Sequence, residues 1–509
     1  MKRLYRYLLY ILPLALCFSY YPLIKLGENE TMYFELSLPL LWLVAFDAVG
    51  FLMVITRYRS KLFSKVFGSA LWWLFPIFVT FSVIWSLNVL RGILTVGLLW
   101  ALFFAVVFFF ELRENLDAKF WKIFWRWFFS SALFVCVWCV IQCAMDVLGV
   151  PKEASLLCDG CVYQMFGFPH PNGFTIEPQF MGNLLLAPIM VATWMYINNQ
   201  NSTFRTRVAQ ARLLSAIRAP RGERHGRSAL VLGRDIRMIL KVLLLIVLSS
   251  TLFLTFSRGA IYACIVGLCF LFAFSYFRAK KAERKKVCFS ILKTIGVFVV
   301  SFLFTLNLQG ILAASSPTSD TYGDGVAKVL NQLSLGVIDI RESGKNESEP
   351  DADESSGNDA VENSNESVEN LGKTESAFDG YVAESTDTRV RLSKAAFDIW
   401  RKDFKTIMVG VGIGGAGQAL YDNGLSPAPR EIVQNEYMSL LLETGVVGVF
   451  MFILILIMAI RVISRVGEFS GMILALLVAY GVTLLFFSGF PNAMQIVLLP
   501  GLLTCFAKK

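Results

Sequence analysis

The sequence predicts an all-α polytopic membrane protein with about twelve transmembrane helices. Of its 509 residues, 56% are hydrophobic and only 17% are charged, and the mean hydropathy is +0.59. A soluble domain carries about a quarter charged residues, so this chain lacks the polar surface that a soluble fold of its size requires. The 44 phenylalanines and 11 tryptophans add apolar surface that lipid accommodates. These observations argue against a soluble enzyme, a disulfide-rich secreted scaffold and a disordered chain.

Twelve apolar segments are candidate spans. A helix needs about 20 apolar residues to cross the hydrocarbon core of a bilayer. The predicted spans are residues 7–24, 37–56, 67–86, 92–110, 128–148, 180–197, 240–256, 259–277, 289–311, 437–460, 471–489 and 493–506. The first segment lacks a small-residue cleavage site, so we interpret it as an anchor.

Lys and Arg in the connections predict the orientation. Alternate connections, counted from the N-terminus, hold 31 of the 47 Lys and Arg residues against 7 acidic residues, whereas the intervening connections are short or acidic. Basic connections face the cytoplasm, so both termini are predicted to be cytoplasmic in a multi-pass protein of the cytoplasmic (inner) membrane. The net charge of +9 then reflects topology, and no nucleic-acid partner is expected.

The N-terminal region, residues 1–239, is predicted to hold transmembrane helices and one long basic connection. Residues 198–239 are rich in Arg, and we expect them to form a cytoplasmic loop that lies on anionic membrane lipids. Residues 461–509 are predicted to hold the last transmembrane helices.

The central region, residues 240–460, contains one large outer loop at 312–436. Its part at 342–376 is rich in Ser, Glu, Asn and Asp and is predicted to be a disordered acidic segment. Residues 386–436 regain apolar periodicity, so we expect them to be helical and to fold against the membrane domain.

Four motifs in this region carry a family resemblance. Residues 254–262 read Leu-Thr-Phe-Ser-Arg-Gly-Ala-Ile-Tyr, between two spans, and Thr-Arg-Val-Arg-Leu-Ser-Lys begins at Thr388. Val-Gly-Val-Gly-Ile-Gly-Gly begins at Val409, and Val-Gln-Asn-Glu-Tyr begins at Val433. This ordered set resembles the O-antigen ligase and polymerase family of bacterial envelope glycosyltransferases over about residues 240–455.

The resemblance implies a reaction class and its partners. The donor would be a polyprenyl-pyrophosphate-linked oligosaccharide presented on the outer face of the membrane, and the acceptor a glycan, a lipid or a protein. The resemblance implies metal-independent transfer, and no metal or other cofactor is expected.

One position departs from the family pattern. Ligases of the family carry a His before the Asn of the fourth motif, proposed to activate the acceptor hydroxyl, whereas this chain has Gln434. A Gln side chain cannot accept a proton as a general base. The chain has only two histidines, His170 and His225, and the second lies in the predicted cytoplasmic loop. The departure favours polymerase or repeat-unit transfer over a lipid ligase.

Arginines near the outer surface are the candidate ligands for pyrophosphate, because guanidinium binds phosphate bidentately and stays charged. Arg258 lies in a tight outer turn, where a charge is costly unless it meets an anion; the alternative is a side chain that reaches to the interface. Arg389 and Arg391 begin a predicted amphipathic helix, and the resemblance favours Arg391 for its spacing from Gly410. The alternative for both is a solvated helix start. Arg91, in a short outer connection, is a third candidate.

Carboxylates near the same surface are candidates for acid–base chemistry. Glu177 or Glu436 could accept the hydroxyl proton in place of the missing His, or either could have a supporting structural role. Glu443 enters a predicted span and is expected to pair with an Arg. Gln434, Asn435 and Glu436 are expected to position the acceptor.

The glycines at 410–415 formally match a dinucleotide-binding fingerprint. The match is spurious, because the segment follows a helix in an outer loop and no βαβ unit surrounds it. We expect Gly410 and Gly412 instead to let the chain reverse and to bring backbone N–H groups near phosphate.

The remaining polar features are assigned structural roles. Cys158 and Cys161 have no second cysteine or histidine pair nearby, so a local disulfide is expected and zinc is not. Asp47 is interpreted as a helix-packing contact and Asp146 as an interfacial residue.

Two other functional classes stay open. A transporter or a flippase for lipid-linked oligosaccharide is compatible with twelve spans, but it predicts internal repeats and charges at mid-bilayer. A sensor or scaffold would use the acidic segment 342–376 to bind a partner.

Overall fold

The computed structural model shows that each predicted span falls on a helix. It describes residues 1–21, 23–29, 32–57, 68–158, 161–162, 169–199, 226–315, 321–333, 388–429, 432–487, 489 and 493–506. The helices of the twelve predicted spans are α1 (Lys2–Cys17), α2 (Leu38–Arg57), α3 (Leu71–Ser82), α4 (Val89–Glu111), α5 (Ala118–Val147), α8 (Pro178–Asn199), α10 (Gly226–Leu254), α11 (Arg258–Arg278), α12 (Arg284–Ala314), α17 (Glu436–Ser464), α18 (Ser470–Thr483) and α19 (Gln495–Phe506).

Seven helices of the described chain are long and apolar enough to cross a membrane, namely α2, α4, α5, α8, α11, α12 and α17. Four shorter apolar helices, within α3, α10, α18 and α19, add to the bundle. The chain is therefore a helical, multi-pass membrane protein in character, while the number of twelve crossings stays a prediction.

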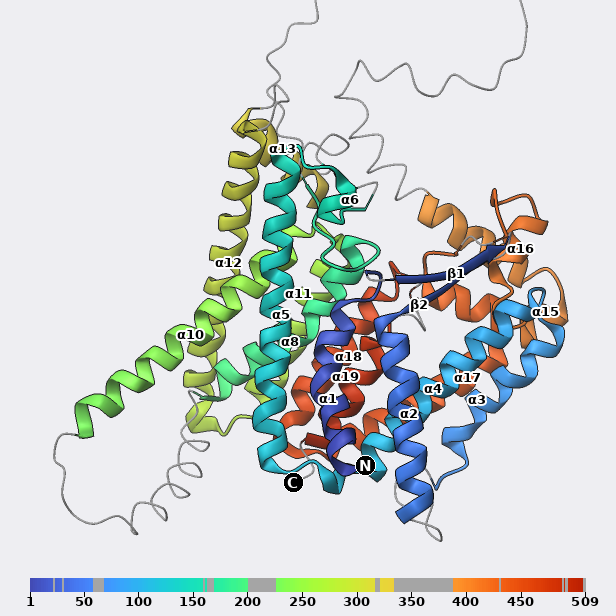
Figure 1. The fold of residues 1–509 in the computed structure, drawn as a ribbon, viewed down its shortest axis with the longest axis horizontal. Coiled ribbons are helices and arrows are strands. Elements are labelled where there is room, and N and C mark those ends of the chain that lie inside the picture. Colours follow the sequence, from blue (N-terminus) through green and yellow to red (C-terminus); the bar gives the residue numbers. More distant parts are fainter. Residues whose placement is uncertain are drawn as a thin grey trace, which may run out of the picture.

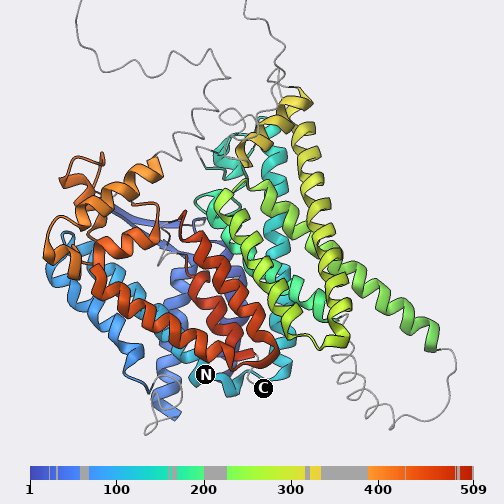
Figure 2. The ribbon, with the colours of Figure 1, turned by 180° about the vertical axis from the view of Figure 1, so that it is seen from behind.

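The helices form two groups with a shared centre. Figure 1 shows α2, α3, α4 and α17 on one side and α5, α8, α10, α11 and α12 on the other, and Figure 2 shows α18 and α19 between them. Packing contacts agree: α18 packs against α8, α11, α17 and α19, while α1 packs against both α2 and α5. The central helices therefore join elements that are far apart in the sequence.

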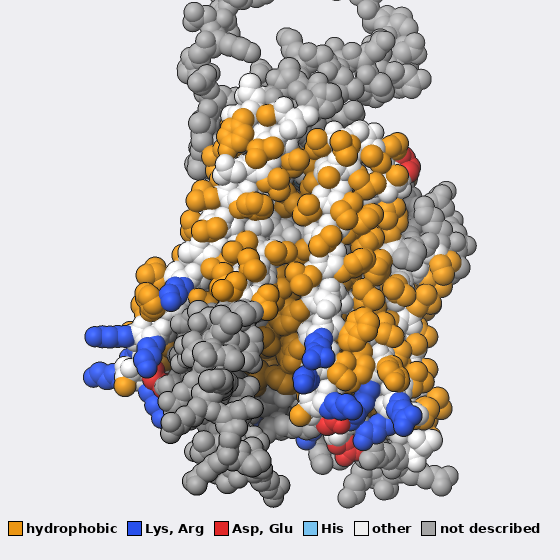
Figure 3. Space-filling view, turned by 60° about the vertical axis from the view of Figure 1, so that its left-hand side comes forward, with side chains coloured by type: hydrophobic (Ala, Val, Ile, Leu, Met, Phe, Trp, Pro, Cys, Tyr) orange, Lys and Arg blue, Asp and Glu red, His pale blue; other side chains and the backbone are white. Residues whose placement is uncertain are grey.

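The two ends of the bundle differ in charge. Both termini lie at one end, at the bottom of Figure 1, which we call the terminal end; the opposite end, which carries α13 (Tyr322–Leu333) and the helix at residues 388–400, is the loop end. Figure 3 shows Lys and Arg gathered at the terminal end, below a mostly hydrophobic surface. There Arg6 of α1 forms an ion pair of 2.6 Å with Asp117 of α5. The predicted cytoplasmic position of the termini is based on this difference in basic charge between the two ends.

The predicted loop 198–239 is shorter than expected. Residues 226–238 form the first part of α10, because nothing in this proline-free stretch breaks a helix. Residues 200–225 of the loop, and the acidic segment 342–376, lie outside the described residues.

A β-hairpin between α1 and α2 was not predicted. Strand β1 (Leu23–Asn29) pairs antiparallel with β2 (Met32–Ser37), with Leu23 opposite Ser37 and Asn29 opposite Met32. Only the outer ends of the hairpin overlap the predicted spans 7–24 and 37–56; the rest of both strands lies in the short connection between them, for which no regular structure was predicted. The pairing satisfies backbone groups of a connection that would otherwise need water.

The predicted outer loop, residues 312–436, is partly helical over its described residues, as expected. Besides α13 and the helix at 388–400, it holds α15 (Phe404–Val409) and α16 (Ala416–Asp422). A short helix α6 (Lys152–Ser155) lies in the connection before α8, and single 3₁₀ turns occur at Val83–Trp85, Arg113–Asn115, Lys281–Glu283 and Gly467–Phe469.

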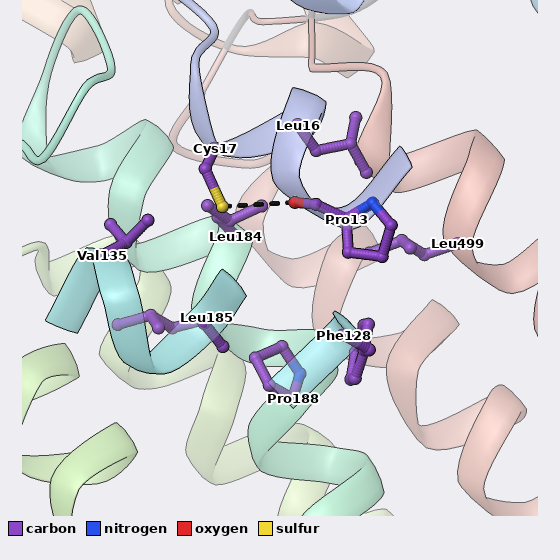
Figure 4. A pocket seen from close by; sticks show the side chains of 10 residues that line it. Pro13, Leu16, Cys17, Phe128, Val135, Leu184, Leu185, Pro188 and Leu499 are labelled. Atoms are coloured by element: carbon purple, nitrogen blue, oxygen red, sulfur yellow. Dashed lines mark hydrogen bonds between the residues drawn. The ribbon is translucent and has the colours of Figure 1, made fainter. Parts of the chain in front are cut away.

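A small apolar cavity lies among the described membrane helices. Figure 4 shows a cavity of about 20 Å³ between α1, α5, α8 and α19, lined by apolar groups such as Pro13, Val135 and Leu185. A volume of this size holds about one water molecule, and a lining without polar groups gives water no partners. This cavity is too small and too apolar for a sugar or a phosphate.

Candidate active site at the loop end

Three helices begin side by side around the end of α18. Nε2 of Gln179, at the start of α8, donates a hydrogen bond of 3.0 Å to the carbonyl oxygen of Phe486. The N–H of Glu436, the first residue of α17, donates to the carbonyl oxygen of Leu484 at 2.9 Å. A Cβ added at Gly259 of α11 would lie 3.0 Å from Phe486. A helix N-terminus carries partial positive charge, so these three starts together suit an anion.

Arg258 is the first residue of α11 and follows the short reversal after α10. The Ser257 hydroxyl oxygen caps the helix by accepting a hydrogen bond of 3.4 Å from the N–H of Ala260. The preceding Phe256 has a φ of +50°, in the left-handed region that a bulky residue rarely adopts. Arg258 is half-buried. It lies at a helix start, in the short turn between two apolar helices that was predicted from the sequence.

The loop at residues 169–177 lies beside this turn. His170 is buried, with 6% exposure, and its ring contacts the Phe256 ring at a centroid separation of 5.1 Å. Burial, and then the charge of Arg258, lower the pKa of His170 to about 3, so the imidazole is neutral at physiological pH. Sequence reasoning gave His170 no role. The available signal was its position shortly after the pair Cys158 and Cys161, which are disulfide-bonded as expected.

The helix at residues 388–400 brings a second arginine to the loop end. It docks through a buried apolar stripe made of Leu392, Ala395, Ala396 and Ile399. Nε of Arg389 donates a hydrogen bond of 3.1 Å to Oε1 of Gln434, which has a φ of +59°. The Arg391 side chain is exposed. The arginine of this helix that contacts the fourth motif is therefore Arg389.

Two carboxylates accompany these groups. Glu177 keeps contact with solvent, yet the surrounding protein raises the pKa of its carboxyl, and the charge of Arg389 opposes that rise. Glu436 begins α17, where the helix dipole favours a negative charge. Asn435 caps the same helix: its Oδ1 accepts hydrogen bonds from the N–H groups of Tyr437 and Met438 at 3.1 and 3.2 Å.

The glycine turn has a packing role that differs from the expected one. The N–H of Gly410 donates to Thr406 at 3.0 Å and that of Gly412 donates to Glu443 at 3.0 Å, so neither amide is available to phosphate in this conformation. Both glycines have positive φ, and a Cβ at Gly412 would collide with the backbone of Ser86. The turn therefore fits between α17 and the start of α4, where only glycine allows the approach.

Arg91 and Glu443 belong to the same packing region. Oε1 of Glu443 accepts a hydrogen bond of 3.3 Å from the N–H of Ala416, and the charge of Arg91 is close enough to act on this carboxylate. Arg91 is thus the arginine whose charge acts on Glu443, while a direct ion pair between the two stays a prediction. Both residues lie beside the glycine turn, and the pyrophosphate-binding role of Arg91 stays a prediction.

The other polar residues named in the sequence analysis lie in different parts of the chain. Asp47 is buried within α2 at 8% exposure, as a packing residue would be. Within the described ranges, no group of three His, Cys, Asp or Glu side chains has the geometry of a metal site. His225 lies outside the described residues.

The arrangement at the loop end suits chemistry on an anionic group. Two guanidinium groups and three helix starts attract negative charge, and two carboxylates, Glu177 and Glu436, accompany them. The cluster lies at one end of a bundle of apolar helices, where a lipid-linked anion would present its head group.

Comparison with known proteins agrees with this picture. Residues 243–453, which include Arg258, Arg389, Gln434 and Glu436, match the family model described as O-antigen ligase. No curated protein matches the chain. The matched region is thus similar to the O-antigen ligase family, and the apolar helices are those of a multi-pass membrane protein. The match supports a ligase- or polymerase-type membrane glycosyltransferase function in surface polysaccharide synthesis.

Proposed function

We propose that the protein polymerises or transfers polyprenyl-pyrophosphate-linked oligosaccharide on the outer face of the cytoplasmic membrane. The observation that carries this proposal is the convergence of Arg258 and the Arg389–Gln434 pair on the end of α18. In this assignment the loop end faces outward, and the acceptor is a glycan, a lipid or a protein.

The arginines hold the donor and its leaving group. Arg258 and Arg389 bind the pyrophosphate oxygens, with the starts of α8, α11 and α17 adding backbone dipoles. As the bond between the anomeric carbon and the pyrophosphate oxygen breaks, its electron pair stays on the pyrophosphate. Charge already in place at that point lowers the barrier without reorganisation. Arg391, which the sequence spacing favoured, lies exposed two residues further along and is assigned a weaker electrostatic contribution.

The acceptor hydroxyl oxygen forms the new bond to the anomeric carbon, and its proton passes to a carboxylate. Glu177 is the preferred base, because its raised pKa makes it a better proton acceptor than an ordinary carboxylate. Gln434 holds Arg389 by accepting its hydrogen bond, and Glu436 and Asn435 shape the acceptor side at the start of α17.

We favour polymerase activity over lipid ligase activity because Gln434 replaces the family's His. Transport of the same lipid-linked oligosaccharide is the alternative. It is less favoured, because the arginines and carboxylates of the site lie at one end of the bundle and not along its middle.

Loss of the gene separates these activities. Surface polysaccharide that collapses to a single repeat unit indicates a polymerase, whereas free polymer on its carrier lipid indicates a ligase. Lipid-linked repeat units trapped on the cytoplasmic side would instead support transport.

A matched pair of variants tests the site. Arg258→Ala should abolish polymer production while the protein still inserts at wild-type levels, and Arg461→Ala, at the opposite end of α17, should produce normal polymer. Normal polymer length in Arg258→Ala would contradict the assignment.

A further inference from the structure

The turn that carries Arg258 depends on an aromatic support from another part of the chain. Phe256 lies two residues before Arg258, is 3% exposed and adopts a backbone conformation that is costly for a bulky residue. Its ring is in contact with the His170 ring at 5.1 Å, with the planes 34° apart. A strained turn persists only where its surroundings hold it, and His170 is one such contact.

His170 is itself held in place on the backbone. Its N–H donates a hydrogen bond of 3.0 Å to the carbonyl oxygen of Cys161, and Cys161 is closed onto Cys158 by a disulfide with a Cα–Cα distance of 5.1 Å. A covalent crosslink limits the movement of the carbonyl to which His170 is bonded. The backbone of His170, and with it the point from which the ring projects, is therefore held by contacts outside α11, the helix that carries Arg258.

The rest of the loop is fixed by a buried amide network. Gln142 of α5 accepts the N–H of Gly173 at 2.8 Å, and its Nε2 donates to the Gly173 carbonyl at 3.0 Å and to Oδ1 of Asn172 at 3.2 Å. The same loop ends at Glu177, whose carboxyl responds to the charge of Arg389. One rigid loop thus touches the surroundings of both arginines.

The charge state of His170 fits a supporting role. Burial and the neighbouring Arg258 keep the imidazole neutral. A neutral ring packs against Phe256 without adding a second positive charge beside Arg258, so the guanidinium remains the group that meets the anion.

We propose that His170 is a positioning residue for the donor site: its ring, anchored by the disulfide-closed turn, supports Phe256 and so orients Arg258 toward the pyrophosphate. This inference rests on the proposed function, since it takes the donor's pyrophosphate as the ligand of Arg258.

Direct binding tests the inference without the transfer reaction. The full chain, in lipid nanodiscs, is titrated with a polyprenyl pyrophosphate that carries no sugar, and separately with the corresponding polyprenol. His170→Ala should weaken binding of the pyrophosphate about tenfold, the scale of a lost aromatic contact, and leave binding of the polyprenol unchanged. His170→Phe, which keeps an aromatic ring, should recover most of the affinity. Tyr10→Ala is the matched control. It removes a ring contact between Tyr10 of α1 and Phe120 of α5, whose centroids are 5.0 Å apart, and it should bind like the wild type.

A double-variant cycle shows whether His170 acts through Arg258. In the Arg258→Ala background, His170→Ala should have no further effect on pyrophosphate affinity. Additive effects, or wild-type affinity in His170→Ala alone, would overturn the inference. If His170→Ala does not yield folded protein, Phe256→Leu takes its place with the same expectations.

The outcomes separate this inference from the proposed function. A wild-type protein that binds polyprenol and pyrophosphate equally overturns the donor site and the inference with it. If Arg258→Ala loses pyrophosphate affinity while His170→Ala keeps it, the donor site stands and the inference fails.

Discussion

Arg389 and Arg391 offer the sharpest test of the site, because they lie two residues apart on one helix and differ in environment. Nε of Arg389 bonds to Gln434 at 3.1 Å, whereas Arg391 is exposed. Loss of one preorganised donor to developing charge costs about 3 to 4 kcal/mol, or about a hundredfold to a thousandfold in rate. Arg389→Ala should therefore reduce transfer at least about a hundredfold, and Arg391→Ala, exposed and screened by water, should reduce it by less than about tenfold.

The pH dependence of the same variants gives a second measurement. Arg389 lowers the pKa of Glu177, so its removal raises that pKa further. If Glu177 must be deprotonated to accept a proton, the acidic limb of the rate profile should move to higher pH in Arg389→Ala and stay in place in Arg391→Ala. The assay is sugar transfer from lipid-linked oligosaccharide in membranes that contain equal amounts of each variant. A loss confined to Arg391→Ala would refute the assignment of Arg389.

Three further predictions concern the frame of the site. The pKa of His170 is about 3 in the folded protein, against 6.5 ordinarily. Below pH 6.5 the unfolded chain therefore binds a proton that the folded protein does not, and the free energy of unfolding falls as the pH falls toward 3. The loss is about 2 kcal/mol at pH 5. His170→Phe should flatten the corresponding fall in Tm between pH 7 and 5. Gly412→Ala should destabilise the protein by about 2 to 4 kcal/mol through a forbidden φ and a backbone clash, while Gly97→Ala, with open space around it, should leave Tm within a degree or two. Cys158→Ser should lower stability by about 2 kcal/mol, and dithiothreitol should lower the Tm of the wild type but not of this variant.

The positions of the helices could be predicted from the sequence because long apolar runs determine them locally. Residues 92–110, for example, lie within α4. The hairpin of β1 and β2 could not be predicted in the same way, since its two ends lie inside apolar runs that were assigned to spans. The basic stretch at 226–239 was assigned to a loop by its charge, although its residues favour a helix.

The candidate site could be predicted less well than the helices, because it depends on tertiary packing. Arg389 precedes Leu392 by three residues and Arg391 precedes Ala395 by four, so both lie beside the apolar stripe and sequence periodicity could not separate them. His170 was missed because its contact with Phe256 arises only when the loop at 169–177 reaches the turn before α11. That arrangement involves segments far apart in the sequence, which no local pattern reports.

The glycine turn shows the limit of a motif. The reversal at Gly410 and Gly412 was predicted correctly, and both residues have positive φ. The role of their N–H groups was not, because α17 supplies carbonyl and side-chain acceptors to this turn that are not evident from the motif itself.

The meeting of α8, α11 and α17 at the end of α18 has a consequence for how the protein tolerates change. Part of its attraction for anions comes from peptide groups, which every residue type supplies, and so no single substitution can erase it. Each arginine variant should retain a background affinity for the carrier lipid. On the proposed assignment, side chains on the acceptor side, such as Glu436, could then be exchanged while the donor is still bound, so that one way of holding the carrier lipid could serve acceptors of different sugars.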